Sequence, residues 1–118
     1  MRIGIMAGTT PETSFGLTGL VAFAQDLEAR KFDTLWLPNT FGMDAVAACA
    51  IAGWETQHIE LGTAVTPTYP RHPAALAQQA LTTQQACGDR FTLGIGLSHQ
   101  LVIEGMYGMS YEKPARHM

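Results

Sequence analysis

The chain has 118 residues, a net charge of -3 and 47% hydrophobic residues, whereas only 14% of its residues are charged. This length and hydrophobic content suit a single domain with a modest core, and the mild acidity without a lysine- or arginine-rich patch argues against nucleic acid as a partner. No apolar run is long enough to span a membrane, and the chain begins without a signal-peptide pattern. The two cysteines, Cys49 and Cys87, lie in apolar helical segments, which predicts buried free thiols and a cytoplasmic protein.

The first half of the chain alternates short apolar runs with longer helical patterns, in the order strand, helix, strand, helix. A Gly-Thr-Thr-Pro loop ends the first strand, and Pro38 stops the second. The second helix is apolar on almost every side, which predicts that several elements pack against it. These elements are strands at 2–7 and 34–37, a helix from a cap at Thr13 or Ser14 to about residue 30, and a helix from 45 to about 54.

The second half repeats this alternation around a proline-rich turn. Residues 59–65 predict a buried strand, and Pro67, Pro70 and Pro73 prevent its simple continuation as strand or helix. His72 and Pro73 are typical of a helix cap and first turn. Gly88 is typical of the left-handed residue that ends a helix. The remaining predicted elements are a helix at 73–87, a strand at 90–97, a loop-like tail at 105–113 and the start of a helix at residue 114.

The strands begin about every 30 residues, which is the spacing of βαβ units. They are continuous apolar runs, so we expect parallel strands that are covered on both faces. Two architectures satisfy this α/β pattern, namely an open doubly wound sheet and half of an eight-stranded barrel. A complete barrel takes about 250 residues. The last predicted helix stops within its first turn, which indicates a piece of a longer protein.

Three groups of polar or irregular residues follow predicted strands directly. They are Asn39–Thr40, Ala64–Val65–Thr66 and Ser98–His99. Parallel α/β folds place ligand sites at the carboxyl ends of their strands, so we expect these groups to share one rim. Their position alone does not specify a reaction.

Other motifs in the sequence do not indicate a site. The pair Gly94 and Gly96 lacks the third glycine of a dinucleotide fingerprint and lies inside a strand. The sequence around Ser98 lacks the final glycine of a nucleophile elbow, and no apolar helix is predicted immediately after it. The four histidines share no metal-ligand spacing, so no metal site is predicted.

The segments LGTAVTPTYPRHPAALAQQALT (61–82), RFTLGIGLSH (90–99) and GMYGMSYEKPARHM (105–118) resemble the bacterial luciferase-like superfamily. Within it, the chain is most similar to the branch of oxidoreductases that use the deazaflavin coenzyme F420. The resemblance covers essentially the whole chain but only the amino-terminal part of a family member. It implies that residues 1–118 form one partial domain, the amino-terminal half of a TIM-type (β/α)8 barrel with four β/α units.

The resemblance also implies a cofactor ring at the strand ends and hydride transfer between F420 and an unknown small organic substrate. Family members often have a cis peptide bond without proline after the third strand, which maps to Ala64–Val65 or its neighbour, and this bulge lies against the middle of the ring. Asn39 corresponds to a position that commonly contacts the polar edge of the ring. At this rim the candidate cofactor-binding residues are Asn39, Ala64, Val65, Thr66 and Ser98, and His99 is the candidate catalytic proton donor or acceptor.

Several alternatives remain open at this point. An FMN-dependent monooxygenase of the same fold shares most of these motifs. A third hypothesis is a catalytically incomplete fragment that works only when assembled with a missing half, because four strands do not close a barrel. Asn39–Thr40 and His99 depart from the residues that the family's sugar-phosphate dehydrogenases have there, which argues against glucose-6-phosphate as substrate. Family members are often homodimers, so a homo-oligomer is expected.

Overall fold

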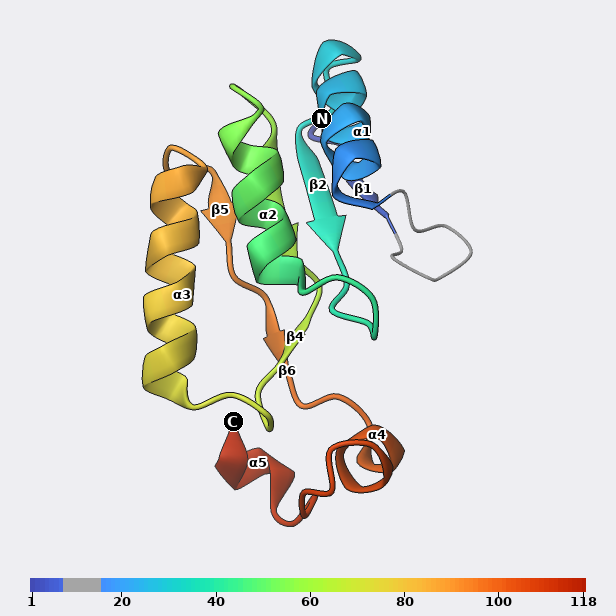
Figure 1. Ribbon diagram of the computed structural model, residues 1–118, viewed down its shortest axis with the longest axis vertical. Helices are drawn as coiled ribbons and strands as arrows, with labels where there is room; N and C mark the ends of the chain where they lie inside the picture. The colour runs from blue at the N-terminus through green and yellow to red at the C-terminus, as the bar shows by residue number, and fades with distance from the viewer. Residues whose placement is uncertain (8–15) are drawn as a thin grey trace.

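The computed structural model describes residues 1–7 and 16–118, and the predicted caps at Thr13 and Ser14 lie outside this range. Helices alternate with strands or with pairs of short strands as far as residue 96, and two short helices follow (Figure 1). The elements are β1 (Gly4–Met6), α1 (Gly16–Ala29), β2 (Thr34–Leu37), α2 (Ala45–Trp54), β3 (Glu60–Thr63), β4 (Thr66–Pro67), α3 (Pro73–Ala86), β5 (Phe91–Thr92), β6 (Ile95–Gly96), α4 (Gln100–Gly105) and α5 (Pro114–His117).

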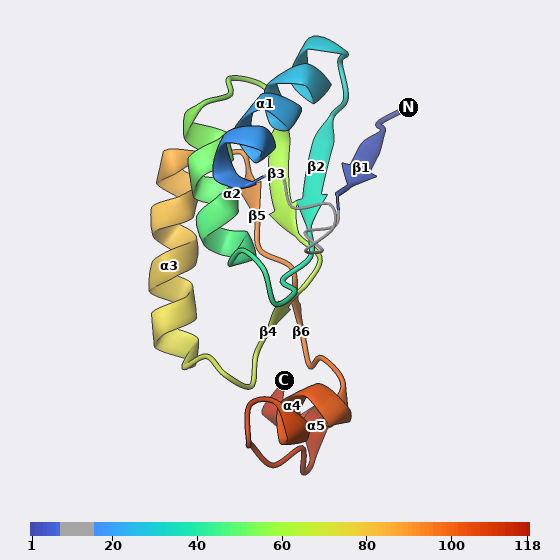
Figure 2. The ribbon, with the colours of Figure 1, turned by 45° about the vertical axis from the view of Figure 1, so that its right-hand side comes forward.

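The main sheet has the strand order β1-β2-β3-β5, and every neighbouring pair is parallel. Helices α1, α2 and α3 all lie on the same side of this sheet (Figure 2). A doubly wound sheet would place helices on both sides and reverse its strand order at a switch point. Sequential order with helices on one side is instead the arrangement of a TIM-type barrel, so the half-barrel alternative is confirmed.

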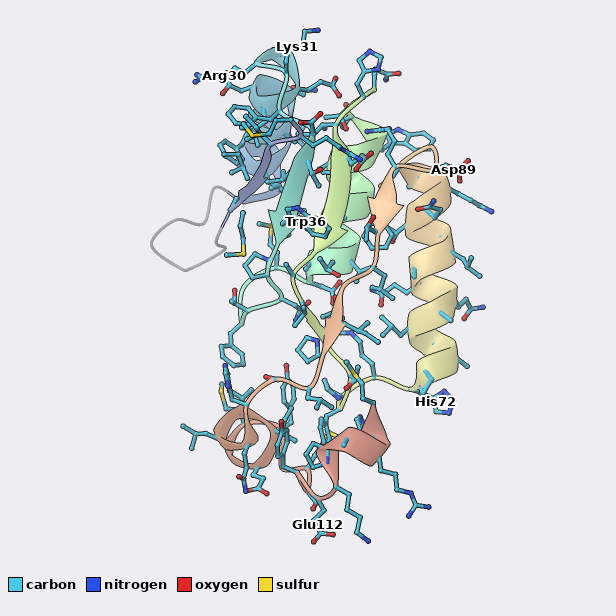
Figure 3. All side chains as sticks on the ribbon, turned by 180° about the vertical axis from the view of Figure 1, so that it is seen from behind. Arg30, Lys31, Trp36, His72, Asp89 and Glu112 are labelled. Atoms are coloured by element: carbon cyan, nitrogen blue, oxygen red, sulfur yellow. The ribbon has the colours of Figure 1, made fainter. Side chains whose placement is uncertain are left out.

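The prediction that both faces of the strands are covered is wrong for the described part of the chain. Leu35, Leu37 and Leu61 point to the helices and are fully buried, whereas Met6 on the opposite face is 67% exposed. Trp36 lies on this open face of the sheet (Figure 3) and packs across Gly62, where an added Cβ would lie 2.3 Å from the indole ring. The apolar side chains on one face of the sheet therefore pack against the helix layer. No second layer covers the other face within the described part of the chain.

The core lies between the sheet and the three helices. Helix α2 occupies its centre and packs against α1, α3 and β3, which confirms the prediction from its apolar sequence. Cys49 and Cys87 are both fully buried and free, as predicted. Burial raises the pKa of both thiols, so they stay protonated at neutral pH.

Helix boundaries follow the predicted capping residues. His72 precedes α3 in extended conformation, and its Nδ1 accepts a hydrogen bond from the backbone N–H of Ala74 at 3.2 Å. Gly88 ends the same helix with φ of +55°, and Asp89 follows with φ of +64°. Lys31, after α1, also has a positive φ of 67°. These left-handed residues turn each helix directly back into the next strand.

The predicted strand at 59–65 is interrupted, and so is the predicted strand at 90–97. The first ends at Thr63, before a cis peptide bond between Ala64 and Val65, and resumes as β4. Opposite it, Thr63 Oγ1 donates to the carbonyl of Gly94 at 2.8 Å and accepts from the backbone N–H of Gly94 at 3.0 Å. A side chain thus replaces the backbone partner at this point, and β4 then pairs with β6 in a second, two-stranded sheet.

The sequence predicted no apolar helix immediately after Ser98; the structure has a short, mostly exposed helix there, α4, which begins at Gln100. The fully buried Ile103 anchors this short helix, whereas most of its other residues are exposed. The sequence of the helix therefore has no apolar stripe from which it could be predicted. The chain beyond α4 is held by aromatic contacts. Tyr69 stacks on Tyr111, with ring centroids 5.1 Å apart, and on His117 at 3.8 Å.

Glu28, near the end of α1, holds the loop before β3 through hydrogen bonds. Its carboxylate accepts hydrogen bonds from the backbone N–H groups of Gln57 (3.0 Å), His58 (2.6 Å) and Ile59 (2.9 Å). Burial alone would raise the pKa of Glu28, but these three hydrogen bonds outweigh it and hold the pKa below its ordinary value of 4.5. Ionised Glu28 therefore stabilises the fold.

We expect Glu28→Gln to lower the free energy of unfolding at pH 7 by about 1 kcal/mol, because charged acceptors form stronger hydrogen bonds. Since the folded pKa is lowered, the contribution of Glu28 is complete above pH 4.5 and disappears as the pH falls through the folded pKa. Urea titrations at pH 7 and pH 3.5 should show a smaller pH effect in Glu28→Gln than in wild type. Glu112→Gln, at an exposed carboxylate in the tail, is the control; equal pH effects in both variants would contradict this role for Glu28.

Candidate functional site

The carboxyl ends of β2, in the main sheet, and of β4 and β6, in the two-stranded sheet, meet at one rim. A hollow of about 240 Å³ lies there, and residues from all three strand ends form its wall. Five of the predicted site residues line it, namely Asn39, Thr40, Val65, Ser98 and His99. The rest of the lining consists of Pro38, Phe41, Pro67, Val102 and Tyr107. The predicted common rim is therefore present in the structure.

Asn39 links the end of β2 to its neighbours through both main chain and side chain. Its backbone N–H donates to the carbonyl of Val65 at 3.4 Å. Its side-chain Oδ1 accepts from the first backbone N–H of α2, at Ala45, at 3.0 Å, and from the Arg71 guanidinium at 3.3 Å. The amide oxygen of Asn39 is thus held by two donors.

Val65 forms the apolar part of the wall. The cis peptide bond between Ala64 and Val65 stands at the position that the family resemblance implies, and the Val65 side chain is 43% exposed. Gly96 of β6 approaches it closely, since an added Cβ there would lie 2.5 Å from Val65 Cγ2. Of the two neighbouring candidates, Ala64 is half-buried and Thr66 is fully buried, and neither lines the hollow.

Ser98 and His99 form the third part of the wall. Ser98 has a positive φ of 64°, and its carbonyl accepts a hydrogen bond from the Tyr111 hydroxyl at 3.2 Å. His99 is the residue before α4; its side chain makes no capping hydrogen bond to that helix and is exposed. The imidazole is therefore accessible from the hollow.

The structure adds residues that the sequence analysis did not assign to the site. Arg71 lies behind Asn39 and forms an ion pair with Asp44 at 2.6 Å. Phe41 and Tyr107 add aromatic surface to the hollow. The sequence did contain a signal for Arg71, because it is a lone arginine within the proline-rich segment PRHP in a chain with few charges. Tyr107 had no comparable signal, because the fold of the tail brings it to the rim.

Three buried polar atoms near β4 lack a hydrogen-bond partner among the described residues: Thr66 Oγ1, Thr68 Oγ1 and Tyr69 OH. Burial raises the pKa of Tyr69, with smaller contributions from Tyr111 and Glu104, so its hydroxyl remains a neutral donor. Burying a hydroxyl without a hydrogen-bond partner is unfavourable, so these three groups have hydrogen-bonding capacity left over at this end of the sheet.

A neighbouring hollow of about 260 Å³ lies between α3, β6 and the end of the chain. Leu76, Leu93 and Ile95 contribute to its largely apolar wall, and it contains none of the predicted site residues. Among residues 1–7 and 16–118, no group of three histidine, cysteine or acidic side chains is arranged to hold a metal ion. No helix in the same ranges has the length and apolar character needed to cross a membrane.

The chain is similar in sequence to part of two proteins whose names describe an oxidoreductase and a reductase. A protein of Mycobacterium tuberculosis with the provisional name coenzyme F420-dependent oxidoreductase is 41% identical over 95 residues, which are 80% of this chain and 26% of that protein. The 5,10-methylenetetrahydromethanopterin reductase of Methanolobus tindarius is 30% identical over 93 residues, 78% of this chain and 28% of the reductase. The chain spans only about a quarter of the length of these relatives.

Solved structures share the fold at lower sequence identity. The coenzyme F420-dependent tetrahydromethanopterin reductase from Methanopyrus kandleri has a TM-score of 0.79 at 22% identity, over 93% of this chain and 30% of that one. A second structure is the FMN complex of the oxygenating constituent of 3,6-diketocamphane monooxygenase from Pseudomonas putida. It has a TM-score of 0.83 at 16% identity, over 99% of this chain and 36% of that one. The family profile described as luciferase-like monooxygenase matches residues 1–118. The chain belongs to the luciferase-like monooxygenase family.

Proposed function

We propose that this chain forms one wall of the cofactor site of an oxidoreductase that transfers hydride between coenzyme F420 and a small organic substrate. The observation that carries the proposal is the meeting of Asn39, Val65 and Ser98–His99, from three strand ends, around one hollow. The name of the Mycobacterium tuberculosis relative supports F420 over FMN. The two structural neighbours support the fold alone and leave the choice of cofactor to experiment.

The residues at the rim fit the ring portion of such a cofactor. Val65 offers an exposed apolar surface on which a flat ring can rest, and Asn39 offers an amide at its edge. Ligand pockets usually measure about 300–1,000 Å³, so a hollow of about 240 Å³ suits one wall of a site better than a whole one. The described lining contains no lysine or arginine, so the phosphate-bearing tail of F420 would be held by other residues.

F420, when bound, supplies the hydride chemistry, and this chain supplies contacts and a proton-transfer group. Val65 and the neighbouring Pro38 and Pro67 line the hollow with apolar side chains, which would keep water from one side of a bound ring. His99 presents an accessible imidazole at the same hollow, where it can donate a proton to the substrate or accept one from it.

Titration of the chain with F420, followed by the fluorescence of the deazaflavin, and competition with FMN test this proposal. We expect F420 to bind more tightly than FMN. Val65→Asp should lower the affinity for F420 at least tenfold, because it places a charge against the ring at a cost of about 1.4 kcal/mol or more. Ile51→Asp, at an exposed aliphatic side chain of α2, is the matched control and should leave the affinity unchanged. A tight preference for FMN would favour the monooxygenase alternative, and unchanged affinity in Val65→Asp would reject the site.

The association state of the chain should be measured in the same preparation. Strands β1 and β5 are the two edges of the main sheet, and its inner face exposes Met6. We propose that further strands, from a longer chain or from another copy, complete the wall. Sedimentation velocity should then show self-association of the 118-residue chain; a monodisperse monomer that binds F420 would exclude the need for a second copy.

A further inference from the structure

Arg71 connects three elements behind the wall of the hollow. It lies in the turn between β4 and α3, and its side chain is only 18% exposed. One terminal nitrogen donates to Asp44 Oδ2 at 2.6 Å and to Asn39 Oδ1 at 3.3 Å. The other donates to the backbone carbonyl of Pro67, at the end of β4, at 3.2 Å. The planar guanidinium thus spans the ends of β2 and β4 and the start of α2.

Asp44, the partner of Arg71, is itself held in place. It caps α2, because its Oδ1 accepts from the backbone N–H of Ala47 at 2.9 Å. The same oxygen accepts from Gln79 Nε2 of α3 at 3.3 Å. Since helices α2 and α3 both fix the carboxylate, the position of Arg71 is fixed as well.

This arrangement determines how the Asn39 amide is oriented. Two donors, the backbone N–H of Ala45 and the Arg71 guanidinium, converge on its side-chain oxygen. A reversed amide would place its NH2 group against both donors, so only one orientation is compatible with them. The Nδ2 group is then the polar atom of Asn39 left for a ligand, and it can only donate.

We propose that Arg71 is a positioning residue that holds Asn39 as a hydrogen-bond donor, so that the ligand must present a carbonyl-type acceptor at the β2 end of the hollow. The ligand part of this inference rests on the proposed function. The carbonyl edge of a deazaflavin or flavin ring has the required chemistry. A ligand with only donor groups at this point is rejected, because two donors would face each other.

The first test needs no ligand. In 15N-labelled protein, the two Nδ2 proton signals of Asn39 should be sharp and well separated, because the amide is fixed. In Arg71→Met they should move toward the shifts of a free asparagine and broaden, whereas Arg30→Met, at an exposed arginine at the opposite end of the sheet (Figure 3), should leave them unchanged. If Arg71→Met does not fold, Arg71→Lys replaces it, since lysine keeps the charge beside Asp44 without the planar fork. Unchanged Asn39 signals in the folded variant would overturn the positioning role.

The second test measures affinity for F420, and for FMN as a second probe. Asn39→Ala and Arg71→Met should each weaken F420 binding about tenfold, and the double variant should also lose about tenfold, because both changes remove the same donor. Separate roles would give a loss of about a hundredfold in the double variant and would overturn the inference. Asn39→Asp should weaken binding at least as much as Asn39→Ala, because it places an acceptor against an acceptor; wild-type affinity in Asn39→Asp would overturn the donor assignment. If the wild type binds neither probe, the proposed function and the ligand part fall together, and the amide signals alone decide whether Arg71 positions Asn39.

Discussion

Gly94→Ala is expected to lower the free energy of unfolding by at least about 3 kcal/mol, which is the upper range for overpacking a dense interior. A Cβ at this position would lie 1.9 Å from the carbonyl oxygen of Thr63. The obstructing atom belongs to the backbone of β3, so no side-chain rotation relieves the contact. The two hydrogen bonds between Thr63 Oγ1 and Gly94 would be lost as the strands separate. Urea denaturation followed by circular dichroism measures this loss.

The same substitution should also weaken ligand binding, because Gly94 precedes β6 and the Ser98–His99 segment. Movement of β6 away from β4 would displace one wall of the hollow from the other. Gly105→Ala is the matched control, since an added Cβ there meets no atom within 4 Å, and alanine is favourable in a helix. A Gly94→Ala protein as stable as wild type would show that Gly94 and the backbone of Thr63 in β3 do not approach each other as described.

Arg90→Ala is expected to lower the free energy of unfolding by about 3 kcal/mol, because it removes a charged donor from several buried acceptors at once. Arg90 donates to the carbonyls of Ile59 at 2.6 Å, Gly53 at 2.8 Å and Thr56 at 2.8 Å. These carbonyls belong to the carboxyl end of α2 and the turn into β3, where a positive charge is also favourable. Without the guanidinium, all three carbonyls lose the donor that they share.

Two further variants separate this role from a general effect of charge. Arg90→Lys should recover only part of the stability, since one ammonium group cannot reach all the carbonyls that the guanidinium contacts. Arg30→Ala removes an exposed pair with Asp26 and should change the free energy of unfolding by less than about 1 kcal/mol. Equal losses in Arg90→Ala and Arg30→Ala would contradict the proposed role of Arg90.

The sequence predicted those parts of the fold that local chemistry determines. The bounds of α2, the His72 cap and the left-handed Gly88 follow from capping residues and apolar runs, and all three are present. The common rim follows from parallel strands, because residues after each strand must meet at one edge. The family resemblance, not the strand pattern, gave the cis bond between Ala64 and Val65.

The remaining features depend on contacts between segments that are far apart in the sequence. The interruption of both predicted strands near Thr63 and Gly94 arises from a pair of cross-strand hydrogen bonds, which a pattern of apolar residues does not encode. The role of Arg71 depends on Asp44, 27 residues away, and on Asn39, 32 residues away. Helix α4 escaped prediction because a single buried residue, Ile103, anchors it.

The most direct test of the account is to map F420 on the protein by the change in backbone amide shifts of the 15N-labelled chain during titration. The proposed site predicts that the largest changes fall on Asn39, Val65, Ser98 and His99, with little change in the neighbouring hollow around Leu76 and Ala77. Saturable changes centred on Leu76 and Ala77, or no changes at any concentration of F420, would contradict the assignment of the site.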